Sequence, residues 1–150
     1  MDEGDLAPDF ELPDETGTPR RLSDFLSAGP VVLFFYPAAM TMGCTAECRH
    51  FRDLAADFRD AGAQRLGISR DPVEKQRRFS DRNAFDFPLL SDEDGSVARS
   101  FGVHRSFGLA PTKRTTFVIG RDRRVVRVIR SELNMRVHAD RALAALRAQG

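Results

Sequence analysis

Three features that would point to particular protein classes are scarce in this sequence: cysteines, long apolar runs and charge of a single sign. Lys and Arg number 23 and Asp and Glu 22, which leaves a formal net charge of +1. Nucleic-acid-binding proteins carry a basic patch, and this balance gives no sign of one. The longest apolar run, residues 30–40, is too short to cross a bilayer, and the acidic residues 1–5 do not resemble a secretory signal. We therefore expect neither a nucleic-acid nor a membrane partner.

Cysteine occurs only at Cys44 and Cys48, with three residues between them. Without an export signal, this pair does not form an extracellular disulfide framework. We expect a cytoplasmic protein, and in that reducing compartment two such cysteines are catalytic, metal-binding or merely buried.

The chain of 150 residues has the length of a single domain, and neither repeats nor Gly/Ser-rich linkers divide it. We expect one domain, residues 1–150. Pro and Gly residues in the first 30 positions indicate an N-terminal hairpin, followed by a short helix with Ser23 as its N-cap. Residues 102–113 are expected to form a loop.

Hydrophobic patterning predicts the remaining elements. Strands are expected at residues 31–36, 64–69, 88–90, 115–119 and 125–129, and helices at 44–61, 72–83, 96–101 and 137–148. Residues 31–36 are apolar throughout, which is typical of a central strand covered on both faces. Asp71 is the expected N-cap of the helix that begins at Pro72. Strands and helices alternate and end in a hairpin and a helix, a pattern that predicts a three-layer α/β domain.

Cys44 lies where the central strand passes through a short loop to the start of a helix. The unpaired N–H groups of the first helical turn and the positive end of the helix dipole favour an anion, so we expect this thiol to ionise readily. The thiolate is the nucleophilic form of cysteine.

The residues around this cysteine carry a resemblance to a known family. Residues 36–44 have the spacing Pro37-x-x-x-Thr41-x-x-Cys44, which resembles the active-site signature of the peroxiredoxins, and Arg114 precedes a strand as the family's second landmark does. Residues 7–10, 43–53 and 87–92 resemble the peroxiredoxin Q group, also called bacterioferritin comigratory proteins. The similarity covers nearly the whole chain.

This resemblance implies a thioredoxin-like fold, in which helices flank a central mixed sheet and a hairpin is added at the N-terminus. It also implies thiol-dependent reduction of hydrogen peroxide or organic hydroperoxides without a cofactor or a metal. The reductant would be thioredoxin or a similar thiol donor, and the chain would be a monomer or a weak homodimer.

The family chemistry assigns a role to each motif residue. The Cys44 thiolate would attack one peroxide oxygen while negative charge develops on the other. Arg114 would stabilise the thiolate and the developing oxyanion, the Thr41 hydroxyl would hydrogen-bond the peroxide, and Pro37 would shape the loop and shield the sulfur from water. Backbone N–H groups near Gly43 and Cys44 would complete the pocket.

The loop departs from the common family pattern, because Met40 and Met42 introduce two thioethers where many relatives carry charged residues or proline. One interpretation is an apolar mouth that favours bulky organic hydroperoxides over hydrogen peroxide. The other is that both methionines pack inward as flexible gap-fillers.

Attack leaves Cys44 as a sulfenic acid, and Cys48 is the second thiol of the chain that can condense with it. The peroxiredoxin Q spacing has four intervening residues rather than three, so this role is argued from geometry. Cβ atoms four residues apart on a helix lie about 5–6 Å from each other, whereas a disulfide needs about 3.5–4.5 Å. Resolution by Cys48 therefore requires local unwinding of the helix; otherwise Cys48 stays packed and an external thiol resolves Cys44.

The spacing Cys-x-x-x-Cys after a central strand also resembles the Sco-type copper chaperones, which gives copper binding as an alternative function. Two thiolates suit Cu(I). Those proteins need a distal histidine, however, and His50, His104 and His138 lie outside any matching motif, with His50 expected at the surface. A thiol–disulfide oxidoreductase would instead need Cys-x-x-Cys.

Overall fold

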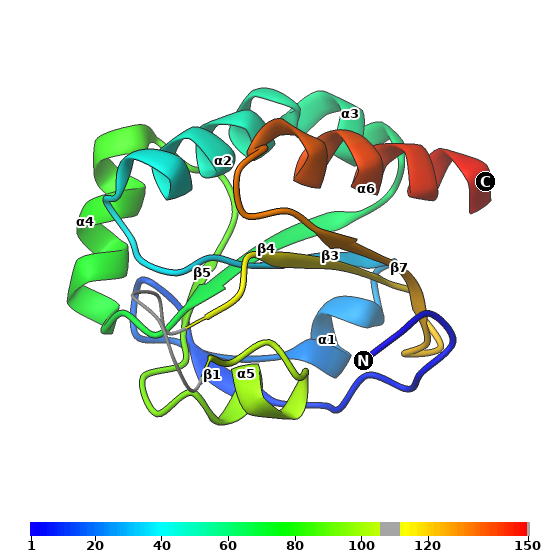
Figure 1. Cartoon of the computed structure of the whole chain (residues 1–150), viewed down its shortest axis with the longest axis horizontal. Coiled ribbons are helices and arrows are strands. Elements are labelled where there is room, and N and C mark those ends of the chain that lie inside the picture. Colours follow the sequence, from blue (N-terminus) through cyan, green and yellow to red (C-terminus); the bar gives the residue numbers. More distant parts are fainter. Residues whose placement is uncertain (106–111, 150) are drawn as a thin grey trace.

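The computed structural model describes residues 1–105 and 112–149 (Figure 1). Its elements are β1 (Glu11–Pro13), β2 (Pro19–Arg21), α1 (Leu22–Leu26), β3 (Val31–Phe35), α2 (Met42–Asp53), α3 (Ala55–Asp60), β4 (Gln64–Ser69), α4 (Val73–Asn83), β5 (Leu89–Ser91), α5 (Ser96–Ser100), β6 (Thr115–Ile119), β7 (Val125–Arg130) and α6 (Arg136–Gln149). Each predicted strand and helix has a counterpart in the structure, although some bounds differ by one or two residues and the helix predicted at residues 44–61 is divided in two.

The central sheet contains five strands in the order β5-β4-β3-β6-β7. β3 pairs in parallel with β4 and antiparallel with β6, so the sheet is mixed. β6 and β7 form the predicted antiparallel hairpin, and β1 and β2 form a separate hairpin near the N-terminus. Both the mixed sheet and the N-terminal hairpin confirm the expected fold.

Helices cover both faces of this sheet, with α2, α3 and α6 on one side and α1 and α5 on the other (Figure 1). We call the first side the α2 face. Successive residues of β3 alternate between the two sides, as Val32 and Phe34 pack on the α2 face and Leu33 and Phe35 pack on the opposite face. A strand buried on both faces needs apolar residues at every position, which explains the continuous run that predicted it.

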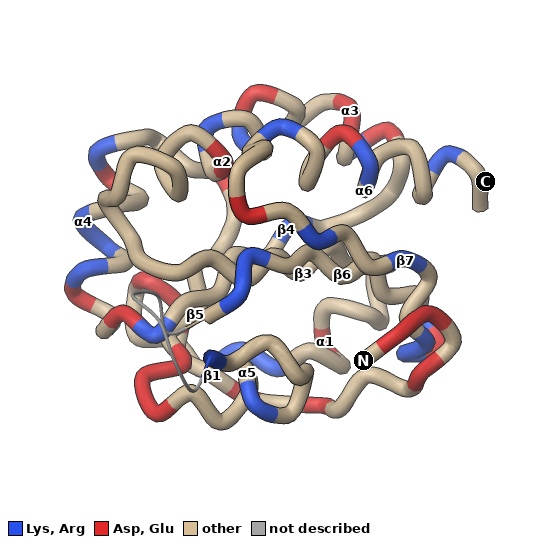
Figure 2. The backbone as a smooth tube through the Cα atoms, viewed as in Figure 1, with Lys and Arg blue, Asp and Glu red and all other residues tan. Residues whose placement is uncertain are grey.

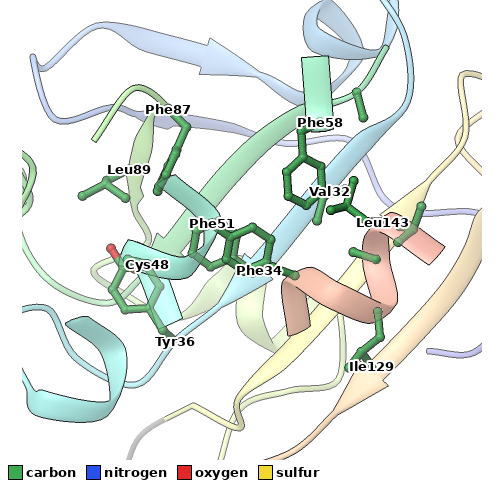
Figure 3. Close-up of a cluster of buried hydrophobic side chains, with 14 of the residues drawn as sticks. Val32, Phe34, Tyr36, Cys48, Phe51, Phe58, Phe87, Leu89, Ile129 and Leu143 are labelled. Carbon is green, nitrogen blue, oxygen red and sulfur yellow. The ribbon is translucent and has the colours of Figure 1, made fainter. Parts of the chain in front are cut away.

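Aromatic rings form the centre of the α2 face (Figure 3). Phe34 of β3 stacks on Phe51 of α2 with ring centroids 4.0 Å apart and planes at 8°. The buried Tyr36 hydroxyl donates to Oε1 of Gln76 at 2.6 Å. Cys48 belongs to the same cluster. This packing holds α2 firmly against the strand that precedes it.

The single helix predicted at residues 44–61 is wrong in one respect, because it is two helices. α2 begins two residues earlier, at Met42, and ends at Asp53; Leu54, at φ −95° and ψ 20°, separates it from α3. Neither Gly nor Pro marks this break. Apolar spacing continues across it because Phe51 before the break and Phe58 after it are both buried on the α2 face.

Two predicted helix caps are also wrong. Ser23 lies inside α1, and its backbone N–H and hydroxyl donate to Asp9 at 2.9 Å each. Pro72 occupies the N-cap position of α4, while the Asp71 carboxylate accepts from the N–H of Ala39 at 2.7 Å. In both places the polar side chain hydrogen-bonds a residue that is distant in the sequence instead of capping its own helix. Asp71 thereby anchors the loop that leads to Cys44.

Charged residues of both signs are distributed over the molecule (Figure 2). None of the helices in residues 1–105 and 112–149 combines the length and the apolar character that a bilayer crossing requires. The predicted loop at residues 102–113 includes a bridge between His104 and Thr112, and its residues 106–111 lie outside the described part of the chain.

Candidate active site

Cys44 is the third residue of α2, and its side chain is buried. The loop at residues 36–41 connects it to the end of β3. The first N–H groups of a helix have no acceptor within the helix, and here the backbone bonding starts with Thr45 N–H donating to the Thr41 carbonyl at 2.9 Å. The sulfur therefore belongs to the electropositive end of α2, as the sequence predicts.

Arg114 meets Cys44 because of strand register. Thr115 pairs with Phe35 at the end of β3, so the residue before it reaches the point where the chain turns into α2. The Arg114 side chain is buried, and its Nη2 donates to Cys44 Sγ at 3.3 Å. A buried guanidinium at this distance stabilises negative charge on the sulfur. The structure thus brings the arginine of the second motif into contact with the cysteine of the first.

Arg114 is itself held by the carboxyl groups of two glutamates. Its Nη1 donates to Glu47 Oε1 at 2.6 Å, and its backbone N–H donates to Glu132 Oε2 at 2.9 Å. Burial raises the pKa of Glu47 to about 8, and the neighbouring Arg114 charge opposes that rise. Gly43 completes the enclosure, since a Cβ added there would lie 3.3 Å from Arg114 Nη2.

Thr41 and Pro37 lie in the loop before α2, as predicted. Thr41 is the N-cap residue and is exposed; its hydroxyl donates to the Ala38 carbonyl at 2.8 Å. Pro37 is half-buried. Within the described residues, neither side chain has a hydrogen bond to Cys44.

Cys48 lies one turn after Cys44 on the intact α2 helix, and both thiols are free and buried. Burial raises the pKa of the Cys48 thiol well above its usual value, and the nearby Glu47 and Cys44 add to this rise. Cys48 is therefore a neutral packed thiol as long as α2 stays folded.

Three residues around the site differ from the sequence expectation. Glu47 and His138 were not predicted as site residues, although Glu47 follows Cys44 by three positions and so shares its helix face. His138 Nδ1 lies 3.6 Å from Glu47 Oε2. The predicted surface position of His50 is wrong: its side chain is only 11% exposed, and Nε2 lies 2.7 Å from Asp140 Oδ1.

A hollow of about 540 Å³ lies at the other end of α6, between Pro30, Val126 and Leu146. None of the predicted site residues lines it. The candidate active site is therefore defined by the groups around Cys44 Sγ and not by this cavity.

Comparison with known proteins gives a consistent result. The AhpC/TSA family model matches residues 4–128. The crystal structure of peroxidoxin BcpB from Mycobacterium tuberculosis is 63% identical, with a TM-score of 0.95 over 99% of this chain and 97% of that chain. Peroxiredoxin Bcp of Escherichia coli strain K12 is 46% identical over 100 residues, 67% of this chain and 64% of that protein.

A third relative is the bacterioferritin comigratory protein of Xanthomonas campestris, whose structure is 35% identical with a TM-score of 0.85, covering 93% of this chain and 91% of that chain. These relatives do not favour the copper-binding alternative. Family match, fold and the Cys44–Arg114 contact agree. The chain belongs to the AhpC/TSA family and is a peroxiredoxin, a thiol-dependent peroxidase.

Proposed function

We propose that Cys44 is the peroxidatic cysteine. The observation that carries this assignment is the contact of 3.3 Å between Arg114 Nη2 and Cys44 Sγ at the start of α2. The thiolate attacks one peroxide oxygen, so that an S–O bond forms as the O–O bond breaks. Sulfur is oxidised by two electrons to the sulfenic acid, and the departing oxygen takes up a proton to leave as water or an alcohol.

In this proposal Arg114 stabilises the developing charges and Thr41 binds the peroxide. Arg114 stabilises the thiolate and then the charge that develops on the departing oxygen. Thr41 hydrogen-bonds the peroxide from the exposed side of the site, which requires its hydroxyl to turn away from the Ala38 carbonyl. The half-buried Pro37 restricts the loop and limits access of water to the sulfur.

We propose that Cys48 resolves the sulfenic acid. Its thiolate attacks Cys44 Sγ, the S–S bond forms as the S–O bond breaks, and the hydroxide that leaves takes up a proton to become water. Because the pKa of Cys48 is raised by burial, this step needs α2 to unwind and expose the thiol. Unwinding also presents the disulfide to thioredoxin or a similar dithiol, which returns both cysteines to the reduced state.

Intact mass after one equivalent of peroxide, without added thiol, tests these roles. A loss of about two mass units in the parent chain, replaced by a gain of about 16 in Cys48→Ser, is the expected result. Mass change in Cys44→Ser would reject the peroxidatic assignment. A gain of about 16 in the parent would instead assign resolution to an external thiol.

The substrates include organic hydroperoxides in this proposal. Met42 is 89% exposed beside the site, whereas Met40 is half-buried and packs against the α2-face cluster. Of the two loop methionines, Met42 is therefore the one placed to give the mouth apolar character. The Xanthomonas campestris relative is described with alkyl peroxide reduction activity, which supports the same substrate class. Met42→Gln should lower the ratio of cumene hydroperoxide to hydrogen peroxide rate constants, and an unchanged ratio would reject this role.

We also propose that residues 1–150 form one domain that acts in the cytoplasm as a monomer or weak homodimer. A reducing compartment suits an enzyme whose two thiols must be regenerated. Sedimentation velocity over a range of concentrations tests the oligomeric state, and cell fractionation tests the location. A stable dimer or a membrane-associated fraction would contradict these expectations.

A further inference from the structure

One methionine lies beside the active site without a role in the steps of peroxide reduction. Met135 is the last residue of the loop at residues 131–135, which connects β7 to α6. A Cβ placed on Gly43 would lie 3.5 Å from Met135 Sδ and 3.3 Å from Arg114 Nη2. The thioether and the guanidinium therefore meet on the same side of Gly43, the residue before Cys44.

Core packing does not explain the burial of Met135. The residue is half-buried, yet among the described residues it belongs to neither of the hydrophobic clusters that cover the two faces of the sheet. Val137, two residues later, does pack against the cluster on the α2 face. A thioether side chain is flexible and polarizable, and it adapts to apolar groups of varied shape. Met135 is therefore available to contact an apolar ligand in the active site.

Hydrogen bonds hold the 131–135 loop in place. Glu132 Oε2 accepts from the backbone N–H of Arg114 at 2.9 Å, which ties the loop to the start of β6. Within the loop, the Asn134 N–H donates to Ser131 Oγ at 3.1 Å. A side chain on a tethered loop is pre-organised, so a ligand that contacts it has less conformational entropy to offset. The fold thus fixes the backbone of Met135 beside Arg114.

The course of the reaction places the organic group of a hydroperoxide next to this methionine. Cys44 attacks the terminal oxygen, and Arg114 stabilises the charge on the departing oxygen. In an organic hydroperoxide the departing oxygen is the one that is bonded to the organic group. The organic group is therefore attached to an atom beside the Arg114 guanidinium, where Met135 Sδ also lies. Hydrogen peroxide has only a hydrogen at this position.

We propose that Met135 is a specificity-determining residue whose side chain binds the apolar organic group of a hydroperoxide substrate. This inference rests on the proposed role of Cys44, and it gives the substrate a second apolar contact besides Met42. Met42 extends from the start of α2 and is 89% exposed, whereas Met135 comes from the β7–α6 loop and is half-buried. The substrate class is an uncharged alkyl or aryl hydroperoxide, because a thioether offers dispersion contacts and only a weak acceptor.

Met135→Gln is the sharpest variant, because glutamine has a similar length but replaces the thioether by a polar amide. The ratio of the rate constants for oxidation of Cys44 by cumene hydroperoxide and by hydrogen peroxide should fall about tenfold. Met135→Leu keeps an apolar side chain of similar volume, so it should retain most of the parent ratio. Rapid-quench measurement of thiol loss gives both rate constants. Equal ratios in the two variants, whether both fall or neither does, would overturn the proposal.

Leu133→Gln is the matched control. Leu133 lies in the same loop, two residues before Met135, and is 94% exposed. The substitution removes an apolar side chain from the same segment, but this side chain is not among the nearest neighbours of Gly43. Its ratio of rate constants should match that of the parent chain. A fall as large as that of Met135→Gln would mean that any loss of apolar surface from this loop produces the effect, and would overturn the proposal.

Binding of the alcohol product gives a second readout that does not depend on turnover. Cumyl alcohol carries the same organic group as cumene hydroperoxide and is titrated into reduced protein with 13C-labelled methionine methyl groups. The Met135 methyl signal, identified by its loss in Met135→Leu, should shift and saturate. Met1 packs on the opposite face of the sheet and serves as the reference that should not shift. No saturable shift at Met135, or an equal shift at Met1, would overturn the proposal.

Failure of the peroxidatic assignment gives a different pattern. If peroxide does not oxidise the parent, or oxidises Cys44→Ser equally, the role of Cys44 fails, while the methyl shift still decides whether Met135 binds the organic group. If peroxide oxidises Cys44 normally but Met135→Gln and Met135→Leu have equal ratios, only the role of Met135 is rejected.

Discussion

The Arg114 guanidinium makes two contacts in the active site, since Nη1 donates to Glu47 and Nη2 donates to Cys44. Lysine has the same charge but no planar fork, so it cannot make both contacts with fixed geometry. Arg114→Lys should lower the rate constant for oxidation of Cys44 by about a hundredfold. Stopped-flow measurement of peroxide consumption checks this.

The control for this substitution is Arg127→Lys, because the Arg127 side chain is 51% exposed and lies 3.8 Å from Glu3 on the surface. It should leave the rate constant unchanged. A change of less than about threefold in Arg114→Lys would show that charge alone, without the bidentate geometry, supports the reaction.

Motif residues and their supports differ in how well the sequence predicts them. Cys44 and Arg114 occur in recognisable local patterns, and the structure brings them into contact. Glu47 lies among the buried residues of α2, a pattern that by itself indicates only packing. His138 lies in the terminal helix with no neighbouring motif. Glu47 and His138 lie close together because α6 packs across α2, and local sequence patterns do not predict this tertiary contact.

At the scale of the element, α2 must unwind locally in the proposed catalytic cycle, so its stability opposes disulfide formation. Cys44, Cys48 and Phe51 all bury their side chains from this helix. A disulfide between the first two cannot form on an ideal helix, because their Cβ atoms lie about 1 Å or more too far apart. Oxidation should therefore increase amide hydrogen exchange at residues 42–53 in the parent chain.

Cys48→Ser provides the comparison for this prediction, since it forms the sulfenic acid without the disulfide. Exchange at residues 42–53 should stay near that of the reduced protein. Equal exchange in oxidised parent and oxidised variant would mean that sulfenic acid formation alone opens α2, and that the disulfide does not drive the change.

The end of α4 offers a test of local backbone strain. Ala84 terminates this helix in the left-handed region at φ 52° and ψ 47°, which is unfavourable for a residue with a Cβ. Ala84→Gly should raise the free energy of unfolding by about 0.5–1 kcal/mol, the relief of strain being partly offset by the entropy of glycine in the unfolded chain. Urea unfolding measures the change.

Ala46→Gly is the matched control, because Ala46 is exposed within the regular part of α2. The same substitution there should lower stability by about 1 kcal/mol. Destabilisation of similar size at both positions would mean that Ala84 is not strained.

Element bounds show where local patterns are sufficient. The strand β3 follows from a continuous apolar run, since all five of its residues are buried between the two helical layers. The break at Leu54 and the N-cap of α4 do not follow, because neither a glycine nor a proline marks the first, and Asp71 binds a distant backbone N–H in place of capping. Long-range partners override local preference at these positions.

At the scale of the molecule, sheet order creates the active site. β3 and β6 are neighbours, and opposite residues of an antiparallel pair point to the same face. Thr116 pairs with Phe34, which packs on the α2 face, so Thr116 and Arg114 two residues before it are directed there as well. α6 then crosses the same face and adds His138. The site is thus assembled from α2, the start of β6 and α6.

The buried side chains of Glu47 and His138 also predict how stability of the whole molecule depends on pH. The pKa of Glu47 rises from near 4.5 to about 8 on folding, so between these values the native state holds a proton that the unfolded state has released. Stability contributed by this group therefore falls as pH rises and is constant above about 8. His138 has the opposite sign: its lowered pKa makes stability rise with pH until the unfolded value near 6.5 is passed.

Above pH 6.5 the contribution of Glu47 is consequently no longer offset by His138. Glu47→Gln removes the titrating proton, so the stability difference between this variant and the parent should grow in favour of the variant by up to about 2 kcal/mol between pH 6.5 and pH 8. Urea unfolding of both proteins at several pH values gives the difference directly. A difference that is independent of pH in this window would mean that Glu47 is ionised in the folded protein, with its charge balanced by Arg114 at all pH values tested.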